Sequence, residues 1–331
     1  MKVFYHNDAD GECAGFWVKE LAYVEEYIGY IEMDYGREFP FDKIKKNETV
    51  YIVDYSIEPN EMDKLLEITP NVTWIDHHIS AIKKYENYDK EIRGIRYDGV
   101  AGCMLTYCYL KHMTDRNIGD IKPFEESMTE DAPMFTKLIA DYDVWKFEYG
   151  DNTRFFDKGF SLFPHEPEDD IWKTLLTEDS LFKIKYRGSV DEGNLPKNIQ
   201  TIIDNGKTIM TYRYNIMKDY CEKKGFEATL DGHKCYAVNM ALMGTNDFVI
   251  PNVDDYDLLV SFSFDGKMWS YSLRSEIIDC AELAAKFGGG GHKGAAGFNT
   301  KECVLEKGDW LYETNIDRQE TWCNRIIKYI F

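Results

Sequence analysis

The N-terminal segment from His6 to Gly11 combines an imidazole with two carboxylates, Asp8 and Asp10, that are two residues apart. A mixed set of histidine and carboxylate ligands suits divalent metals such as Mn²⁺. Gly11 allows a tight turn into a helix, and the first amides of a helix favour an anion. The structural alternative is an ordinary helix N-cap, with Asp10 as the capping residue. The segment therefore predicts a cation site or a cap.

Two more acidic segments each follow a short apolar run. Asp54 ends one run, and Asp76 ends another that continues into His77 and His78. Asp54 alone would be a turn or cap residue, but beside other ligands it would bridge two metals. Adjacent histidines point to different sides, so one would bind a metal while the other faces substrate. Asp76 would orient a ligand histidine. The alternative for the pair is a surface loop.

Two carboxylates, Asp141 and Asp143, lie in an otherwise apolar helical stretch. Burial of a carboxylate is costly unless it is paired or bound to a metal. The stretch is either a solvated helix face or a further source of ligands, and the residues alone leave both readings open.

A glycine run from Gly288 to Gly291 leads into His292. Consecutive glycines let the backbone approach a ligand and donate amides to a phosphate. Upstream, Arg274 and Ser275 follow a predicted strand, and the planar guanidinium of arginine suits a phosphate. The alternative for the glycine run is a flexible linker.

The elements that must position these residues alternate between strand and helix. Short β-prone runs at residues 2–5, 50–53 and 72–75 each end at one of the acidic segments, and a helical pattern covers 58–68. This alternation is typical of βαβ units in a mostly parallel sheet. Because ligands of such sheets gather at the carboxyl ends of the strands, we expect the acidic segments to meet there.

The second half of the chain has a different pattern. A long polar helix is predicted over about 197–224, and alternating strands with a short helix follow it. We predict an α/β fold in two domains, with a parallel sheet in the N-terminal domain and a mixed sheet in a smaller C-terminal domain. The predicted boundaries are 1–195 for the first domain, 196–225 for a helical connector and 226–331 for the second domain.

Composition limits the function classes. The 331 residues include 59 acidic and 39 basic side chains, a net charge of −20, which disfavours binding to long duplex nucleic acid. A small anionic substrate remains compatible if metal ions neutralise the carboxylates. No long apolar run or signal peptide is evident, and the cysteines form no Cys-x-x-Cys pair. We therefore expect a cytoplasmic protein with no membrane partner and with buried thiols.

Together these segments resemble the DHH phosphoesterase family with a DHHA1 C-terminal domain, in its oligoribonuclease-like branch. The segment at His6 resembles the first motif, Asp54 the second, and Asp76 to His78 the triplet that names the family. Asp141 resembles the fourth-motif aspartate, and residues 288–298 resemble the DHHA1 signature. The resemblance extends from residue 3 to about 300 with the motifs in the expected order.

The resemblance implies a metal-dependent phosphoesterase that holds two divalent cations, with Mn²⁺ favoured over Mg²⁺ or Co²⁺. Asp54 would bridge the cations, and Asp141 is preferred to Asp143 as the better positional match. The implied metal ligands are His6, Asp8, Asp10, Asp54, His77 and Asp141. The implied catalytic residues are His78 and Asp76. The implied substrate-binding residues are Arg274, Ser275, Gly289, Gly290, Gly291 and His292.

The expected reaction is hydrolysis of short oligonucleotides, from di- to pentanucleotides such as pApA, to 5′-mononucleotides. Two cations would activate the attacking water and stabilise the leaving oxygen. Three alternatives use the same site: a cyclic-dinucleotide phosphodiesterase, a nucleoside 3′,5′-bisphosphate phosphatase and a non-catalytic nucleotide sensor. The sequence leaves open the natural substrate, the cleavage polarity, the choice of RNA or DNA, and the oligomeric state, a homodimer included.

Overall fold

The computed structural model describes residues 1–22, 27–113, 124–186, 195–240, 248–250 and 252–307. The chain forms two compact units, Met1–Met210 and Thr211–Phe331. The end of the predicted C-terminal domain, from residue 308 onward, lies outside the described residues.

The first unit contains a sheet in which the described strands are all parallel and are ordered β2-β1-β3-β4. Its strands are β1 (Lys2–His6), β2 (Gly29–Met33), β3 (Val50–Val53) and β4 (Val72–Ile75). Short apolar strands of this kind are typical of a parallel sheet buried on both faces.

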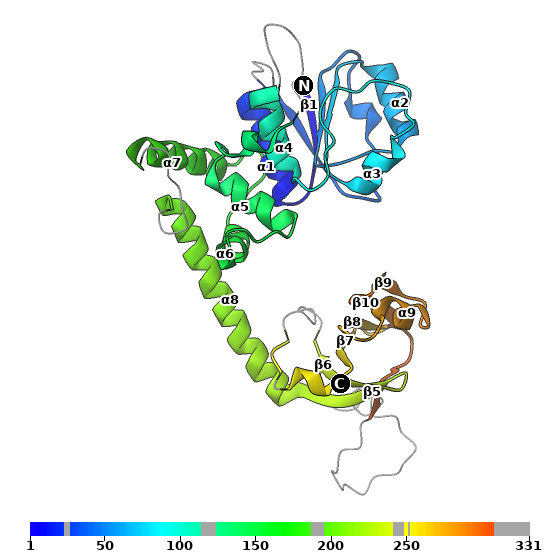
Figure 1. The fold of residues 1–331 in the computed structure, drawn as a ribbon. Helices are drawn as coiled ribbons and strands as arrows, with labels where there is room; N and C mark the ends of the chain where they lie inside the picture. The colour runs from blue at the N-terminus through cyan, green and yellow to red at the C-terminus, as the bar shows by residue number, and fades with distance from the viewer. Residues whose placement is uncertain (23–26, 114–123, 187–194, 241–247, 251, 308–331) are drawn as a thin grey trace, which may run out of the picture. The chain divides into compact units, whose positions relative to one another are not determined.

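Successive side chains of each strand point to opposite faces of this sheet. On β1, Val3 and Tyr5 join one hydrophobic core while Phe4 joins another. On β4, Trp74 and Ile75 divide in the same way. In Figure 1, α1 and α4 lie on one side of the strands, whereas α2 and α3 lie on the other. Both faces are therefore covered, and ligands have access only at the strand ends.

Helices connect and cover the strands of the first unit. They are α1 (Ala9–Leu21), α2 (Pro59–Ile68), α3 (Ile79–Lys84), α4 (Gly102–Cys108), α5 (Met134–Asp143), α6 (Asp151–Phe160) and α7 (Asp170–Tyr186). A π-helical turn, Tyr109–Met113, extends α4. At α2, Pro59 occupies the first turn and a capping box joins Glu58 to Glu61.

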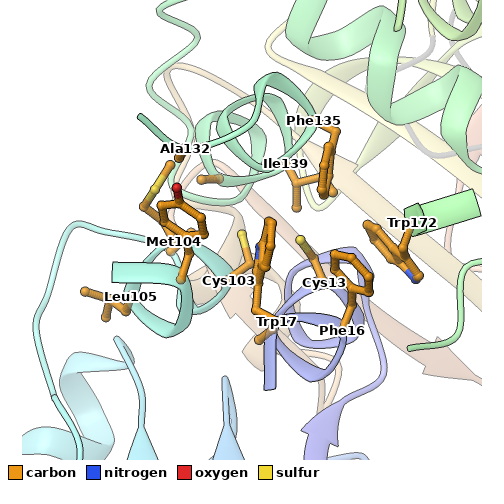
Figure 2. Close-up of a cluster of buried hydrophobic side chains, with 14 of the residues drawn as sticks. Cys13, Phe16, Trp17, Cys103, Met104, Leu105, Ala132, Phe135, Ile139 and Trp172 are labelled. Atoms are coloured by element: carbon orange, nitrogen blue, oxygen red, sulfur yellow. The ribbon is translucent and has the colours of Figure 1, made fainter. Parts of the chain in front are cut away.

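An aromatic core fixes α1, α4, α5 and α7 to one another (Figure 2). The ring of Trp17 stacks on Phe135, with centroids 5.8 Å apart, and the ring of Phe16 stacks on Trp172 at 5.6 Å. The indole Nε1 of Trp17 also donates to the hydroxyl of Thr136 across 3.2 Å. This packing sets the rotation of α1 and α5, which carry acidic residues at the sheet edge.

The long helix α8 (Lys197–Lys224) crosses the boundary between the two units in sequence. Its first turns bury Ile199 and Ile202 in the core of the first unit. Its last turns bury Met217 and Cys221 in a small cluster with Val238. The helix predicted over 197–224 is confirmed.

The second unit contains a mixed sheet with the described order β11-β5-β6-β7-β8-β10-β9. Among the strand pairs that the structure describes in this sheet, only β6–β7 is parallel. Helix α9 buries Cys280 and Leu283 against this sheet. The elements are β5 (Gly225–Leu230), β6 (His233–Asn239), β7 (Leu258–Phe264), β8 (Trp269–Arg274), α9 (Cys280–Ala285), β9 (Gly290–His292), β10 (Ala295–Thr300) and β11 (Glu306–Lys307).

The predicted fold class is confirmed, with a parallel sheet in the first unit and a mixed sheet in the second. None of the helices that the structure describes combines the length and apolar character needed for a membrane span. The thiols predicted to be buried are found at Cys13, Cys103, Cys108, Cys221, Cys235 and Cys280, whereas Cys303 is disulfide-bonded. The cytoplasmic location and the oligomeric state stay predictions.

Candidate metal centre

The carboxyl ends of β1, β3 and β4 bring their acidic and imidazole side chains together, as the strand pattern predicts. Atoms of His6, Asp8 and Asp54 lie within 4.8 Å of one another, and so do atoms of Asp54, His77 and His78. Asp54 belongs to both groups. Its carboxylate therefore lies where it would bridge two cations.

The turn after β1 serves as a helix cap and as part of the cluster. Asp8 caps α1 by accepting from the amide of Gly11 at 2.9 Å, and its second oxygen lies 2.7 Å from Nδ1 of His6. The hydrogen bond to Asp8 raises the pKa of His6. A Cβ at Gly11 would collide with the backbone of His6. The cap predicted for this segment is present, but it is formed by Asp8 rather than Asp10.

Asp10 is buried at the N-terminus of α4. Its two oxygens accept from the amides of Gly102, at 2.7 Å, and Cys103, at 2.9 Å. A Cβ at Gly102 would lie 2.6–2.9 Å from the side chain of Asp54, so only glycine fits between the two carboxylates. The first turn of α4 therefore positions Asp10 and leaves room for Asp54.

His77 faces three of the carboxylates. Its Nε2 lies 3.1 Å from Asp54 Oδ1, 3.5 Å from Asp143 Oδ2 and 3.8 Å from Asp10 Oδ2. The atoms of Asp10, His77 and Asp143 also form a compact group. This group supplies a further set of potential ligands, which shares His77 with the group of Asp54, His77 and His78.

Among the described residues, the carboxylate of Asp143 lies in this cluster, whereas that of Asp141, the residue preferred from the sequence, makes other contacts. The carboxylate of Asp141 accepts from the amides of Glu148 at 2.8 Å and Tyr149 at 3.3 Å, and from the hydroxyl of Thr153. These contacts join the end of α5 to the start of α6. Asp141 thus holds the loop after Asp143 in place.

His78 is held by Asp76 on the same strand end. Asp76 Oδ1 lies 2.7 Å from Nδ1 of His78 and accepts from the amides of His77 and His78. The hydrogen bond to Asp76 raises the pKa of His78. Because Asp76 is completely buried, it orients His78 and has no access to a substrate. These contacts agree with the expectation that Asp76 orients a histidine.

The donor set fits divalent cations, because buried carboxylate oxygens lack hydrogen-bond partners. Among the described residues these oxygens are Asp54 Oδ1, Asp76 Oδ2 and Asp143 Oδ2. Burial and the negative charges of Asp10 and Asp8 raise the pKa of Asp143 to about 8. Burial and neighbouring carboxylates raise the pKa of Asp54 well above its usual range. Cations would satisfy these oxygens and offset the mutual repulsion.

The second unit places some of its predicted substrate residues in one row. In the strand register Arg274 pairs with Ala295, which pairs with His292, so all three side chains share one face of the sheet. All three are exposed. The small side chain of Ala295 leaves the space between arginine and histidine open. This row places an exposed guanidinium and an exposed imidazole on one face, an arrangement suited to an anion.

Two of the predicted substrate-binding residues, Ser275 and Gly289, also make hydrogen bonds within the second unit. The Ser275 hydroxyl donates to the carbonyl of Asp257 at 2.6 Å and accepts from the amides of Ile277 and Ile278. The amide of Gly289 donates to the carbonyl of Ala284. Gly290 and Gly291 are not loop residues but belong to β9, paired with Gly297 and Ala296.

Sequence reasoning missed an aromatic neighbour of the cluster, Tyr35, which follows β2. Its ring lies 5.4 Å from His6 and 5.8 Å from His78, between centroids. Reading Gly29–Met33 as a fourth strand would have placed Tyr35 at the same sheet edge. Glu12 and His165, which are hydrogen-bonded beside the cluster, were also missed.

The strand-end motifs and a sequence similarity that extends over most of the chain point to the DHH phosphoesterase family, whose members are metal-dependent hydrolases of phosphodiester bonds. No family model matches the chain.

The matches to particular relatives have low sequence identity but extend over most of the chain. The chain is 24% identical over 324 residues to the oligoribonuclease NrnB of Bacillus subtilis, a match that covers 92% of this chain and 74% of NrnB. It is 25% identical over 291 residues to an uncharacterized protein, R106, of Acanthamoeba polyphaga mimivirus, covering 84% of this chain and 59% of the relative.

Solved structures are more remote. The pGpG-specific phosphodiesterase PggH of Vibrio cholerae matches with a TM-score of 0.44 and 11% identity, over 91% of this chain and 93% of PggH. At this TM-score the likeness adds nothing to the sequence match.

Proposed function

We propose that the protein is a Mn²⁺-dependent phosphodiesterase that hydrolyses short oligonucleotides, from di- to pentanucleotides, to 5′-mononucleotides. The observation that carries the proposal is the position of Asp54, whose buried carboxylate is shared by two groups of potential metal ligands. The name of the relative NrnB, an oligoribonuclease, supports a short nucleic acid as substrate.

Two cations would have distinct ligand sets in this proposal. His6, Asp8 and Asp54 would hold one, and Asp10, Asp54, His77 and Asp143 would hold the other. Cations bound there would supply Lewis acidity to the phosphate and lower the pKa of water. Mn²⁺ is favoured because it accepts imidazole together with carboxylate ligands.

The remaining residues would orient the substrate. His78, held through Nδ1 by Asp76, presents Nε2 for a hydrogen bond to a phosphate oxygen. Arg274 would bind a second anionic group of the substrate through its planar guanidinium, with His292 in the same row. The net charge of −20 supports a substrate with few phosphates, because each extra phosphate is repelled.

A time course with 5′-labelled pApA tests the proposal. We expect AMP release with Mn²⁺ and none with EDTA. Asp54→Asn should lose this activity, whereas the control Asp63→Asn, at a surface carboxylate that pairs with Lys90, should keep it. Full Mn²⁺-dependent activity in Asp54→Asn would refute the proposed centre. Absence of turnover in the wild type with Mn²⁺ bound would refute the proposed reaction and favour the sensor alternative.

A further inference from the structure

A pocket of about 280 Å³ opens beside the carboxylate cluster in the first unit. Asp8, Asp10 and Asp143 line one end of it. Its other walls come from Ala9, α5, α6, the turn between these two helices and the segment after α6. The larger apolar side chains among them are Leu138, Ile139, Tyr142, Trp145, Phe156 and Phe160. The volume is near the lower end of the range of ligand pockets, about 300–1,000 Å³.

The rim of the pocket presents aromatic faces. Trp145 is 68% exposed and has a left-handed backbone, with φ of 55°. Its ring lies 6.2 Å from Tyr142 and 5.4 Å from Phe147, between centroids. A left-handed conformation is rare for a bulky residue and indicates a local constraint. The contacts of Asp141 with Glu148 and Tyr149 bracket this turn and hold it.

Polar groups lie among the apolar walls. The imidazole of His165 is stacked on Phe160, with centroids 4.9 Å apart, and its Nδ1 is hydrogen-bonded to Glu12. This arrangement fixes the ring and leaves Nε2 for a ligand. Ser161 donates its hydroxyl to the carbonyl of Lys158, so its oxygen remains an acceptor. The pocket thus combines flat apolar walls with fixed hydrogen-bonding groups.

These features select among ligands. A second phosphate is unsuited, because four carboxylates, those of Asp8, Asp10, Asp143 and Asp157, line the pocket. A purely aliphatic group would leave the hydrogen-bonding groups of His165 and Ser161 unpaired. A flat, uncharged heterocycle with polar edges satisfies both conditions, because aromatic faces stack on bases without regard to sequence.

We propose that this pocket binds the base of the nucleotide whose phosphate lies at the carboxylate cluster. The proposal rests on the proposed function for the position of the phosphate. The pocket and the cluster share Asp8, Asp10 and Asp143, so a nucleotide spans both without any other site. Trp145 and Tyr142 stack on the base, and His165 contacts its edge or the ribose.

The test compares pApA with an abasic dinucleotide of the same phosphate number. In the wild type, kcat/KM with Mn²⁺ should favour pApA by about tenfold or more, as expected for base stacking on aromatic side chains. Trp145→Ala removes a wall of the pocket, and Ser161→Trp blocks the pocket. Each variant should lower this ratio toward one. Tyr212→Ala, an aromatic control on α8 that is 67% exposed, should keep it.

A binding measurement separates the pocket from the reaction. Saturation-transfer NMR with adenosine in EDTA detects binding without cations or hydrolysis, and the signal should be lost in both pocket variants. A wild-type ratio near one, or unchanged ratios in both variants, would overturn the pocket while leaving the proposed function intact. Adenosine binding that the variants abolish, in a protein that does not hydrolyse pApA, would support the pocket and refute the function.

Discussion

Gly102 offers a sharp test of the candidate metal centre. Its amide donates to Asp10, and a Cβ added there would lie 2.6 Å from Cβ and 2.7 Å from Oδ1 of Asp54. Asp54 is 1% exposed and has a φ of 51°, so neither its side chain nor its backbone has room to move freely. Gly102→Ala must therefore displace Asp54 or Asp10.

The stability cost of Gly102→Ala follows from overpacking, which typically costs about 1–3 kcal/mol. For a unit of this size that cost lowers Tm by roughly 2–10 °C. Displacement of a bridging carboxylate should cost more in function, with Mn²⁺ affinity and activity falling about 10- to 100-fold, as when the support of a metal ligand is lost. Thermal unfolding with and without Mn²⁺, and AMP release from pApA, measure the two effects.

Gly15→Ala is the matched control. A Cβ at Gly15 would lie 2.8 Å from the side chain of Pro167. This variant therefore overpacks α1, as Gly102→Ala overpacks α4, but it does not touch Asp54. We expect a comparable loss of Tm with Mn²⁺ affinity retained. If Gly102→Ala bound Mn²⁺ and released AMP as well as Gly15→Ala does, Asp54 would not be a ligand at this position.

Other predictions concern charge and the second unit. Burial and the charges of Asp10 and Asp8 raise the pKa of Asp143 to about 8, so the cation-free folded state keeps a proton that the unfolded chain releases near pH 4. Its stability should fall by about 1.4 kcal/mol per pH unit between about pH 4 and 8. Adding Mn²⁺ should raise Tm by an amount that grows over this pH window. The growth should be smaller in Asp143→Asn, which leaves the raised pKa of Asp54 as the remaining source. Calorimetric titration should show that Asp143→Asn loses Mn²⁺ affinity and that Asp141→Asn keeps it. Asp141→Asn should instead unfold at a lower temperature. Loss of Mn²⁺ affinity in Asp141→Asn but not in Asp143→Asn would identify Asp141 as the ligand. Arg274→Ala should raise KM for pApA about tenfold with kcat nearly unchanged, and a fall in kcat alone would exclude a binding part for Arg274. Because net negative charge repels longer substrates, added KCl should raise kcat/KM for a pentanucleotide relative to pApA; a fall would indicate a cationic groove instead.

The strand-end motifs could be predicted because they depend on local pattern. Residues 50–53 and 72–75 are continuous apolar runs, as burial on both faces of a parallel sheet requires, and each stops at an aspartate. The run Gly29–Met33 contains glutamate and begins with glycine, so it lacks this signal and its strand was missed. Tyr35 was missed with it.

The ligand choice between Asp141 and Asp143 depends on tertiary packing. Two residues along a helix turn the side chain by about 200°, so these carboxylates point to nearly opposite sides of α5. Which one faces the sheet edge is set by the rotation of α5, and that rotation is fixed by contacts such as Phe135 on Trp17. Sequence spacing contains no information about this contact. The β9 pairing of the glycine run is non-local in the same way.

The geometry of the cluster links cation binding to the net charge of the chain. Asp54 and Asp143 keep buried oxygens without hydrogen bonds, although the amides of Gly102 and Cys103 stabilise their neighbour Asp10. Cations at this edge would neutralise only the phosphate that they contact. Any further phosphate of a substrate would be repelled by a chain with a net charge of −20. Under the proposed function, the same excess of carboxylates that requires cations for activity therefore limits the length of the substrate.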